Sequence, residues 1–220
     1  MLKAAYRALG DLTSTPFRMV LVKSIALTIG LFVIVLVLTE LLLVTLTQFS
    51  WPWAESIVAV GTGVVLIVAF FFLMSPVAAA FAGLFLDQVA ETVERQHYPA
   101  DPPGTVLPLR TTLPLAAKFF IVVFAVNIIA LPAALLGFGA LALIIANAYL
   151  LSREYFEMVA MRHMAGEAAR ALRKRNAPAV FLAGLLPAAL TLIPIVNLAV
   201  PLFATSFFTH LFKSVRLPSS

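Results

Sequence analysis

The feature that most constrains this chain is a pair of long segments that contain no Lys, Arg, Asp or Glu. The first covers the 34 residues 119–152, and the second covers the 37 residues 176–212. Each is longer than the about 20 apolar residues that one membrane-spanning helix needs. Each is also interrupted near its middle by helix-breaking residues, at 132–139 and 187–201. The pattern therefore predicts two helical hairpins buried in a lipid bilayer, each entering and leaving on the same side.

The composition agrees with a membrane protein. Hydrophobic residues make up 62% of the 220 residues, and the mean hydropathy is +1.05, whereas soluble domains are about 45–50% apolar. We interpret the net charge of +5 as the excess of Lys and Arg that membrane proteins carry on their cytoplasmic side. It is not interpreted as a nucleic-acid surface. The chain has no Cys, which excludes disulfides and thiolate metal sites.

We expect an all-α integral membrane protein with a single membrane domain over 1–220. It has two long transmembrane helices, two hemi-penetrating (re-entrant) helical hairpins and an N-terminal amphipathic helix. The expected order is an interfacial helix at 1–22, long helices at 23–47 and 54–86, hairpin one at 116–152, a cytoplasmic basic helix at 153–175 and hairpin two at 177–210. This arrangement places all 15 Lys and Arg with both termini on the cytoplasmic side, and only the loop 48–55 outside.

The depth of the hairpins follows from their length. After a turn is subtracted, about 15 residues remain in each arm of hairpin one, or about 22 Å at 1.5 Å per residue. The hydrocarbon core is about 30 Å thick. Half-penetrating hairpins are therefore favoured, and tilted full spans in a locally thinned bilayer are the alternative.

The start of the first long helix is the candidate anion site, formed by Thr15, Pro16, Phe17 and Arg18. Ser14 or Thr15 can cap this helix, and Pro16 suits its first turn. A helix N-terminus beside a guanidinium favours an oxyanion, because free N–H groups and a bidentate donor converge there. The alternative role for Arg18 is an anchor that reaches lipid phosphate.

Polar residues inside the apolar segments are the other candidates. Asn127 and Pro132 in hairpin one, with Pro194 and Asn197 in hairpin two, either line a polar path or stabilise the turns. Glu40 is a functional candidate or a locally hydrogen-bonded carboxylate. We expect all three His residues to be exposed or interfacial. No motif predicts a catalytic residue, a metal site or a cofactor.

Several short segments resemble one known family. The run Leu172–Arg175 (LRKR) is followed by Ile193–Leu198 (IPIVNL) and then Pro201. This order is similar to the basic Leu-Arg-x-Arg run and the Ile-Pro-x-x-Asn-Leu turn of the CysZ-type sulfate permeases of bacterial inner membranes. Residues Ala80–Gln88 resemble the end of that family's second long helix, and Tyr149–Phe156 resemble the exit of its first hairpin.

The resemblance implies a homo-oligomer that takes up sulfate for sulfur assimilation. It also implies two long helices with two hemi-penetrating hairpins, and a sulfate-binding Pro-Gly-Leu-Arg-like turn at the start of the first long helix. The matching segment here is Pro16–Arg18, which lacks the Gly, is one residue shorter and has Met19 in place of a second Arg. We therefore expect transport of sulfate or a similar oxyanion, without enzymatic activity. The alternative is a non-transporting membrane scaffold that shapes the bilayer.

Overall fold

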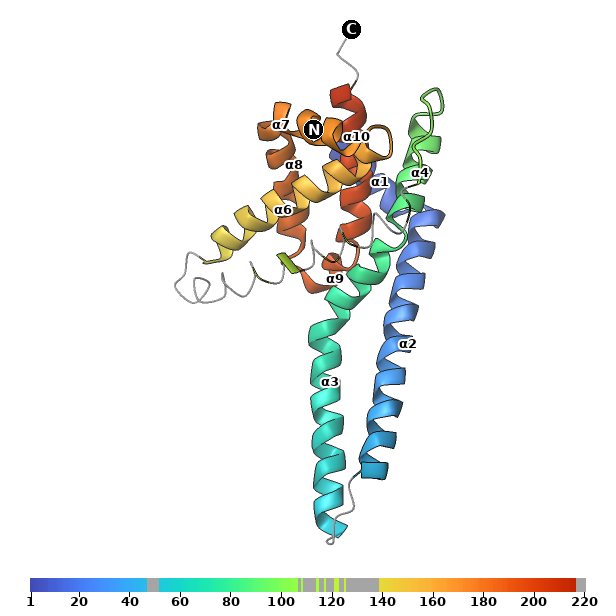
Figure 1. Ribbon diagram of the computed structural model, residues 1–220, viewed down its shortest axis with the longest axis vertical. Helices are drawn as coiled ribbons and strands as arrows, with labels where there is room; N and C mark the ends of the chain where they lie inside the picture. The colour runs from blue at the N-terminus through green and yellow to red at the C-terminus, as the bar shows by residue number, and fades with distance from the viewer. Residues whose placement is uncertain are drawn as a thin grey trace.

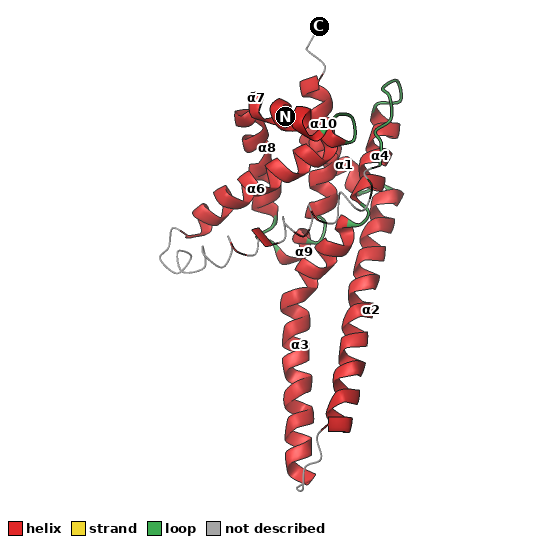
Figure 2. Ribbon diagram, viewed as in Figure 1, coloured by secondary structure: helices red, strands yellow, loops and turns green. Residues whose placement is uncertain are grey.

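A computed structural model describes residues 1–46, 52–106 and 139–216, with the single positions 108, 114, 117, 121, 122 and 125. Every regular element in these ranges is an α-helix (Figure 2), which confirms the all-α class. The helices form two parts (Figure 1). Two long antiparallel helices make a hairpin, and the remaining helices gather beside the half of it that lies near the chain's N-terminus.

The long hairpin consists of α2 (Thr15–Leu46) and α3 (Pro52–Gly83), each with 32 residues. At 1.5 Å per residue each helix is about 48 Å long, which exceeds the about 30 Å of a hydrocarbon core. By length and apolar character Thr15–Leu43 can cross a membrane. Large apolar side chains are exposed along both helices, among them Val33, Ile34, Val37, Ile57, Val60 and Val64. Such a surface is stable in lipid and not in water.

The other part, which we call the helical head, contains the remaining elements. They are α1 (Leu2–Leu12), α4 (Leu86–His97), α6 (Gly139–Met161), α7 (Gly166–Arg175), α8 (Ala177–Leu190), α9 (Pro194–Asn197) and α10 (Val200–Arg216). Within it α10 is central and packs against α1, α4, α6 and α8. Every residue from Val200 to Lys213 is buried. The core is rich in aromatic rings, including Phe156, Phe203, Phe207, Phe208 and Phe212.

The segment 177–210, predicted as hairpin two, contains α8, the short α9 and most of α10. The two arms are separated where the prolines predicted a break, and α9 contacts α3. The arm α8 packs closely on α6 at Gly184, where a Cβ would collide with the backbone carbonyl of Ala148. For hairpin one, the described part is the arm that forms the start of α6. Asn127 and Pro132 lie outside the described residues.

The predicted continuous helix at 153–175 is wrong. The helix α6 runs on from the charge-free segment to Met161, and α7 begins only at Gly166. At the break, the carbonyl of Arg162 accepts hydrogen bonds from the amide and the hydroxyl of Thr105, at 2.8 and 3.0 Å. A loop from elsewhere in the chain thus supplies hydrogen-bond donors to the backbone at the break. The spacing of charges within 153–175 could not predict this contact.

The polar segments lie together at one end of the molecule. The helices α1, α4 and α7 lie at the same end of the molecule as the N-terminus, whereas the ends of α2 and α3 that adjoin 47–51 point the opposite way (Figure 1). The expected location of 1–22, 87–118 and 153–175 on the cytoplasmic side of a membrane stays a prediction.

Candidate functional site

A pocket of about 200 Å³ opens beside the first turns of α2, where that helix meets α4. Its lining comes from two segments: Thr15, Pro16, Phe17, Met19, Val20 and Lys23 on α2, and Gln88, Val89 and Thr92 on α4. The buried side chains of Phe17, Val20 and Val89 belong to one small apolar cluster and form the floor. Lys23, Gln88 and Thr92 provide a charge and polar groups around it.

Three of the four predicted anion-site residues line this pocket, and Arg18 does not. Arg18 is exposed, while its neighbours Phe17 and Met19 are among the lining residues. The helix period explains the difference, because residues three or four apart share a face. Pro16, Val20 and Lys23 follow that spacing, so Lys23 rather than Arg18 supplies the cation on the pocket face.

The first backbone N–H groups of α2 have no carbonyl acceptor within the helix. The amide of Arg18 donates to the Ser14 carbonyl at 3.1 Å, which puts Ser14 at the predicted cap position. Its hydroxyl, however, is enclosed and has no hydrogen-bond partner within the described residues. Pro16 has no N–H, so Thr15 and Phe17 carry the first amides, for which a helix offers no acceptor one turn back. These amides favour a negative charge at this end of α2.

The polar groups on the α4 side complete the pocket. The Lys23 ammonium lies 6.0 Å from the centroid of the Phe85 ring, a cation–π contact that leaves the ammonium's other faces free to bind. The Thr92 hydroxyl donates to the Gln88 carbonyl at 2.8 Å, so its oxygen remains an acceptor while the Gln88 amide group is exposed. An anion in the pocket would meet one full positive charge and uncharged donors.

Of the other predicted site residues, Pro194 and Asn197 are described and lie elsewhere. Pro194 starts α9 and Asn197 ends it, and the amide of Asn197 donates to the Ile193 carbonyl at 2.8 Å. They lie at the turn of hairpin two, next to α3 and away from the start of α2 (Figure 1). Glu40 is half-buried near the distal end of α2.

A buried charge network on the far face of α4 was not predicted. Arg162, with a fully buried side chain, pairs with Glu94 at 3.3 Å and also contacts Asp87. His163 bonds the same Glu94 carboxylate at 2.9 Å, and the amide of Gly104 donates to it at 3.1 Å. The partners are 10 to 75 residues apart in sequence, so no local spacing predicts them.

The network fixes the charge state of its carboxylate. Burial alone would raise the pKa of Glu94, but hydrogen bonds and the charge of Arg162, with further bonds from His163 and Gly104, hold that pKa below its usual value. Burial lowers the pKa of His163 despite its contact with Glu94. The network is therefore an ionised Glu94 against a permanent Arg162 cation, with a neutral His163 beside them.

None of the three histidines, which we predicted to be exposed or interfacial, is exposed, and an interfacial location stays a prediction. The side chains of His163 and His210 are only 3% and 1% exposed, and that of His97 is 22% exposed. Each has a carboxylate partner contributed by another helix. A histidine beside a loop in the sequence is easily taken as exposed, because only the tertiary fold reveals what covers it.

Comparison with known proteins identifies the family. The family model described as sulfate transporter CysZ/etoposide-induced protein 2.4 matches residues 4–201, which include the long hairpin, the pocket and most of the helical head. No curated protein matches the chain. The match covers most of the sequence and agrees with the resemblance noted at 172–175 and 193–201. The chain therefore belongs to the sulfate transporter CysZ/etoposide-induced protein 2.4 family.

Proposed function

We propose that the protein transports sulfate or a chemically similar oxyanion across the bacterial inner membrane, in support of sulfur assimilation. The observation that carries the proposal is the pocket beside the first turns of α2, in a chain whose family description names sulfate transporters. Sulfate is a compact dianion whose oxygens all accept hydrogen bonds. The Lys23 ammonium, the first amides of α2 and the side-chain amide of Gln88 suit such an ion.

Arg18 has a different part in this proposal. Its guanidinium is exposed on a neighbouring face of α2, at the end of the molecule where the polar segments gather. A charge at the edge of a binding site mainly raises the rate of encounter, and salt screens it. We place Arg18 at the entrance and Lys23 in the pocket.

The lengths of the arms support half-penetration for hairpin two. The 14 residues of α8 measure about 21 Å. In α10 the first polar residue is Thr205. The stretch from Val200 to Thr209, which precedes His210, is about 15 Å long, and this is half of the about 30 Å hydrocarbon core. The turn at Pro194 and Asn197 would then lie near the membrane midplane. Irregular backbone is tolerated at that depth where it lines a protein-covered or watery path.

The same reasoning extends the proposal to assembly. A hairpin that stops near the midplane does not form a complete path by itself, so we propose a homo-oligomer in which the turns of both hairpins meet. Asn127 and Pro132 would mark the turn of hairpin one, beside Pro194 and Asn197 from hairpin two. Both termini, α1, α4 and α7 would face the cytoplasm.

Sidedness is tested by single-Cys labelling, since the chain has no Cys of its own. Ala168 on α7 is exposed, and a Cys at this position should react only with a reagent that enters the cytoplasm. A Cys at Trp53, near the opposite end, should react from outside. Labelling of residue 168 by an impermeant external reagent would disprove the orientation.

Function is tested by uptake of radiolabelled sulfate into proteoliposomes, with sulfate affinity measured by calorimetry in detergent. Lys23→Gln should weaken binding by about 1.5–3 kcal/mol, the worth of a hydrogen bond to a charged group, or roughly 10–150-fold. Lys3→Gln removes the same charge from an exposed position on α1 and should leave affinity unchanged. Arg18→Gln should slow uptake at low salt more than it changes affinity.

The scaffold alternative makes the opposite prediction. A protein that only shapes the bilayer would show no sulfate uptake above protein-free liposomes, and Lys23→Gln would change nothing. If the wild type takes up sulfate and the Lys23→Gln variant keeps full activity, the protein is a transporter but this pocket is not its sulfate site.

A further inference from the structure

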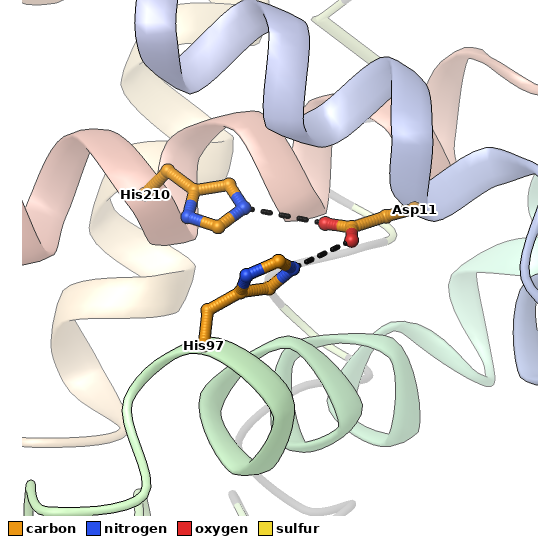
Figure 3. Close-up of side chains that lie close together, drawn as sticks. All are labelled: Asp11, His97 and His210. Atoms are coloured by element: carbon orange, nitrogen blue, oxygen red, sulfur yellow. Dashed lines mark hydrogen bonds and ion pairs between the residues drawn. The ribbon is translucent and has the colours of Figure 1, made fainter.

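Three side chains from three helices meet inside the helical head (Figure 3). Asp11 lies at the C-terminal end of α1, His97 is the last residue of α4, and His210 lies on α10. The Nε2 atom of His97 is 2.8 Å from Asp11 Oδ1, and Nε2 of His210 is 3.2 Å from Asp11 Oδ2. One ligand atom from each residue lies within 4.8 Å of the others.

Two imidazoles and one carboxylate are a donor set that Zn²⁺ and related divalent transition metals prefer. In a tetrahedral site the metal–ligand distances are about 2.0–2.2 Å, so neighbouring ligand atoms are about 3.3 Å apart. The three ligand atoms, one from each residue, lie within 4.8 Å of one another, and the two histidines are 2.8 and 3.2 Å from different oxygens of Asp11. Small side-chain rotations would therefore open the space for an ion between them.

The groups around the three residues also fit a metal. The hydroxyl of Tyr98 lies 2.9 Å from Nδ1 of His210, and the hydroxyl of Ser206 donates to Asp11 Oδ2 at 2.6 Å. Metal-bound histidines usually donate their second N–H to an oxygen, which fixes the ring and its tautomer. With a metal on Nε2, the Nδ1 proton of His210 would be donated to Tyr98. Both histidines already present the same ring nitrogen to the carboxylate.

The surroundings of the carboxylate also suit a cation. Asp11 is only 3% exposed. A buried charge is costly unless it is paired. Among the described residues, the ion pairs of Asp11 are those with the two histidines, while the nearby Lys213 pairs with Asp101 at 2.9 Å.

We propose that Asp11, His97 and His210 form a binding site for one divalent transition-metal ion of the Zn²⁺ class. The three ligands leave one position of a tetrahedral ion for water, on the side where His97 is partly exposed. The ion would join α1, α4 and α10. Because Asp11 precedes the start of α2 by only four residues, it would also hold the joint between α1 and α2 next to the pocket.

The chain makes this proposal easy to test, since it has no Cys and only three His. The full-length protein, purified in detergent with a tag that contains no histidine and stripped of metal with a chelator, is titrated with Co²⁺ and then with Zn²⁺. We expect one Co²⁺ per chain, visible as d–d absorption, and displacement by Zn²⁺. We also expect Zn²⁺ to raise the midpoint of thermal unfolding, because a ligand of the folded state stabilises it.

The variants separate ligands from bystanders. His97→Gln and His210→Gln should each weaken Co²⁺ binding by more than about 100-fold, since losing even an outer partner costs about 10–100-fold. Tyr98→Phe, which removes only an outer partner, should weaken it about 10-fold and keep the absorption spectrum. His163→Gln is the matched control: it removes the third histidine, which bonds Glu94, and should bind Co²⁺ like the wild type.

Two results would overturn the site. One is a folded wild-type protein that takes up no Co²⁺ or Zn²⁺ at micromolar concentration and whose unfolding midpoint does not move. The other is a His163→Gln variant that loses as much binding as His97→Gln. If the His210→Gln variant does not fold, the wild-type titration and Tyr98→Phe still decide the question.

Discussion

The long hairpin and the helical head differ in which side chains they expose and which they bury. Along α2 and α3 the large apolar residues are exposed, whereas the head encloses charged and polar groups such as Asp11, Glu94, Arg162, His210 and Lys213. In lipid, apolar surface gains nothing by leaving the solvent, so helices associate through close packing. The edge-to-face contact of Phe32 and Phe70, 4.9 Å between centroids, is of this kind.

The head, in contrast, is held by contacts that depend on exclusion of water. Its aromatic core and its ion pairs lie together, and the ion pairs connect segments that the core alone would not align. Arg162 binds α4 to the turn after α6, and Lys213 binds α10 to the loop after α4. The comparison implies that single substitutions in the head should be costly where similar ones in the hairpin are mild.

The largest expected effect follows from Arg162→Met. This change leaves Glu94, which is 4% exposed, without its main cation, and breaking a buried pair costs about 3–5 kcal/mol. Arg95→Met is the control on α4, the helix that carries Glu94, because Arg95 pairs with Glu91 at an exposed site where a pair is worth about 0–1 kcal/mol. Denaturant unfolding in detergent measures both. Equal losses would mean that the network contributes no more than a surface pair.

A glycine in each region gives a second, smaller test. A Cβ at Gly184 would meet the Ala148 carbonyl and Ser152, so Gly184→Ala must push α8 away from α6, which costs about 1–3 kcal/mol. At Gly30 on α2 a Cβ meets nothing within 4 Å, and Ala should stabilise the helix by up to about 1 kcal/mol. Thermal unfolding of the two variants should therefore shift in opposite directions. Two shifts of the same sign would contradict the packing at Gly184.

The smallest effect is a loss of stability in acid that comes from the head. The folded pKa of Glu94 is lowered, so its stabilisation is present above its ordinary pKa of 4.5 and is lost as pH falls through the lowered value. For His163 the folded pKa is also lowered, so stability declines as pH falls below 6.5. The loss of stability in acid should be smaller than the loss caused by Arg162→Met, because Glu94 and His163 keep some of their hydrogen bonds when they are protonated. Glu94→Gln should flatten the profile below pH 4.5, where the carboxyl loses its charge, and an unchanged profile there would exclude Glu94 as its source.

The two regions also differ in how well the sequence predicts them. The apolar lengths of α2 and α3, the restart at Ser14–Thr15 and the break near Pro194 follow from local chemistry, since length, capping and proline act over a few residues. The pocket was found only in part, because the choice between Arg18 and Lys23 depends on the face that α4 covers. The contacts of Asp11 with His97 and His210 join residues 86 and 199 apart, and the end of α6 at Met161 depends on Thr105. Tertiary folding alone creates those relations.

The separation of Asp11 and His210 also has a consequence for biosynthesis. A ribosome adds about 5–20 residues per second, so the 199 residues between them take about 10–40 s to make. Until α10 is made, α1 lacks the helix against which it packs, and Asp11 lacks its partners Ser206 and His210. Docking of α10 between α1, α4, α6 and α8 is thus the last step of assembly. A nascent chain that stalls before α10 presents an open head, which a membrane protease can distinguish from the finished protein.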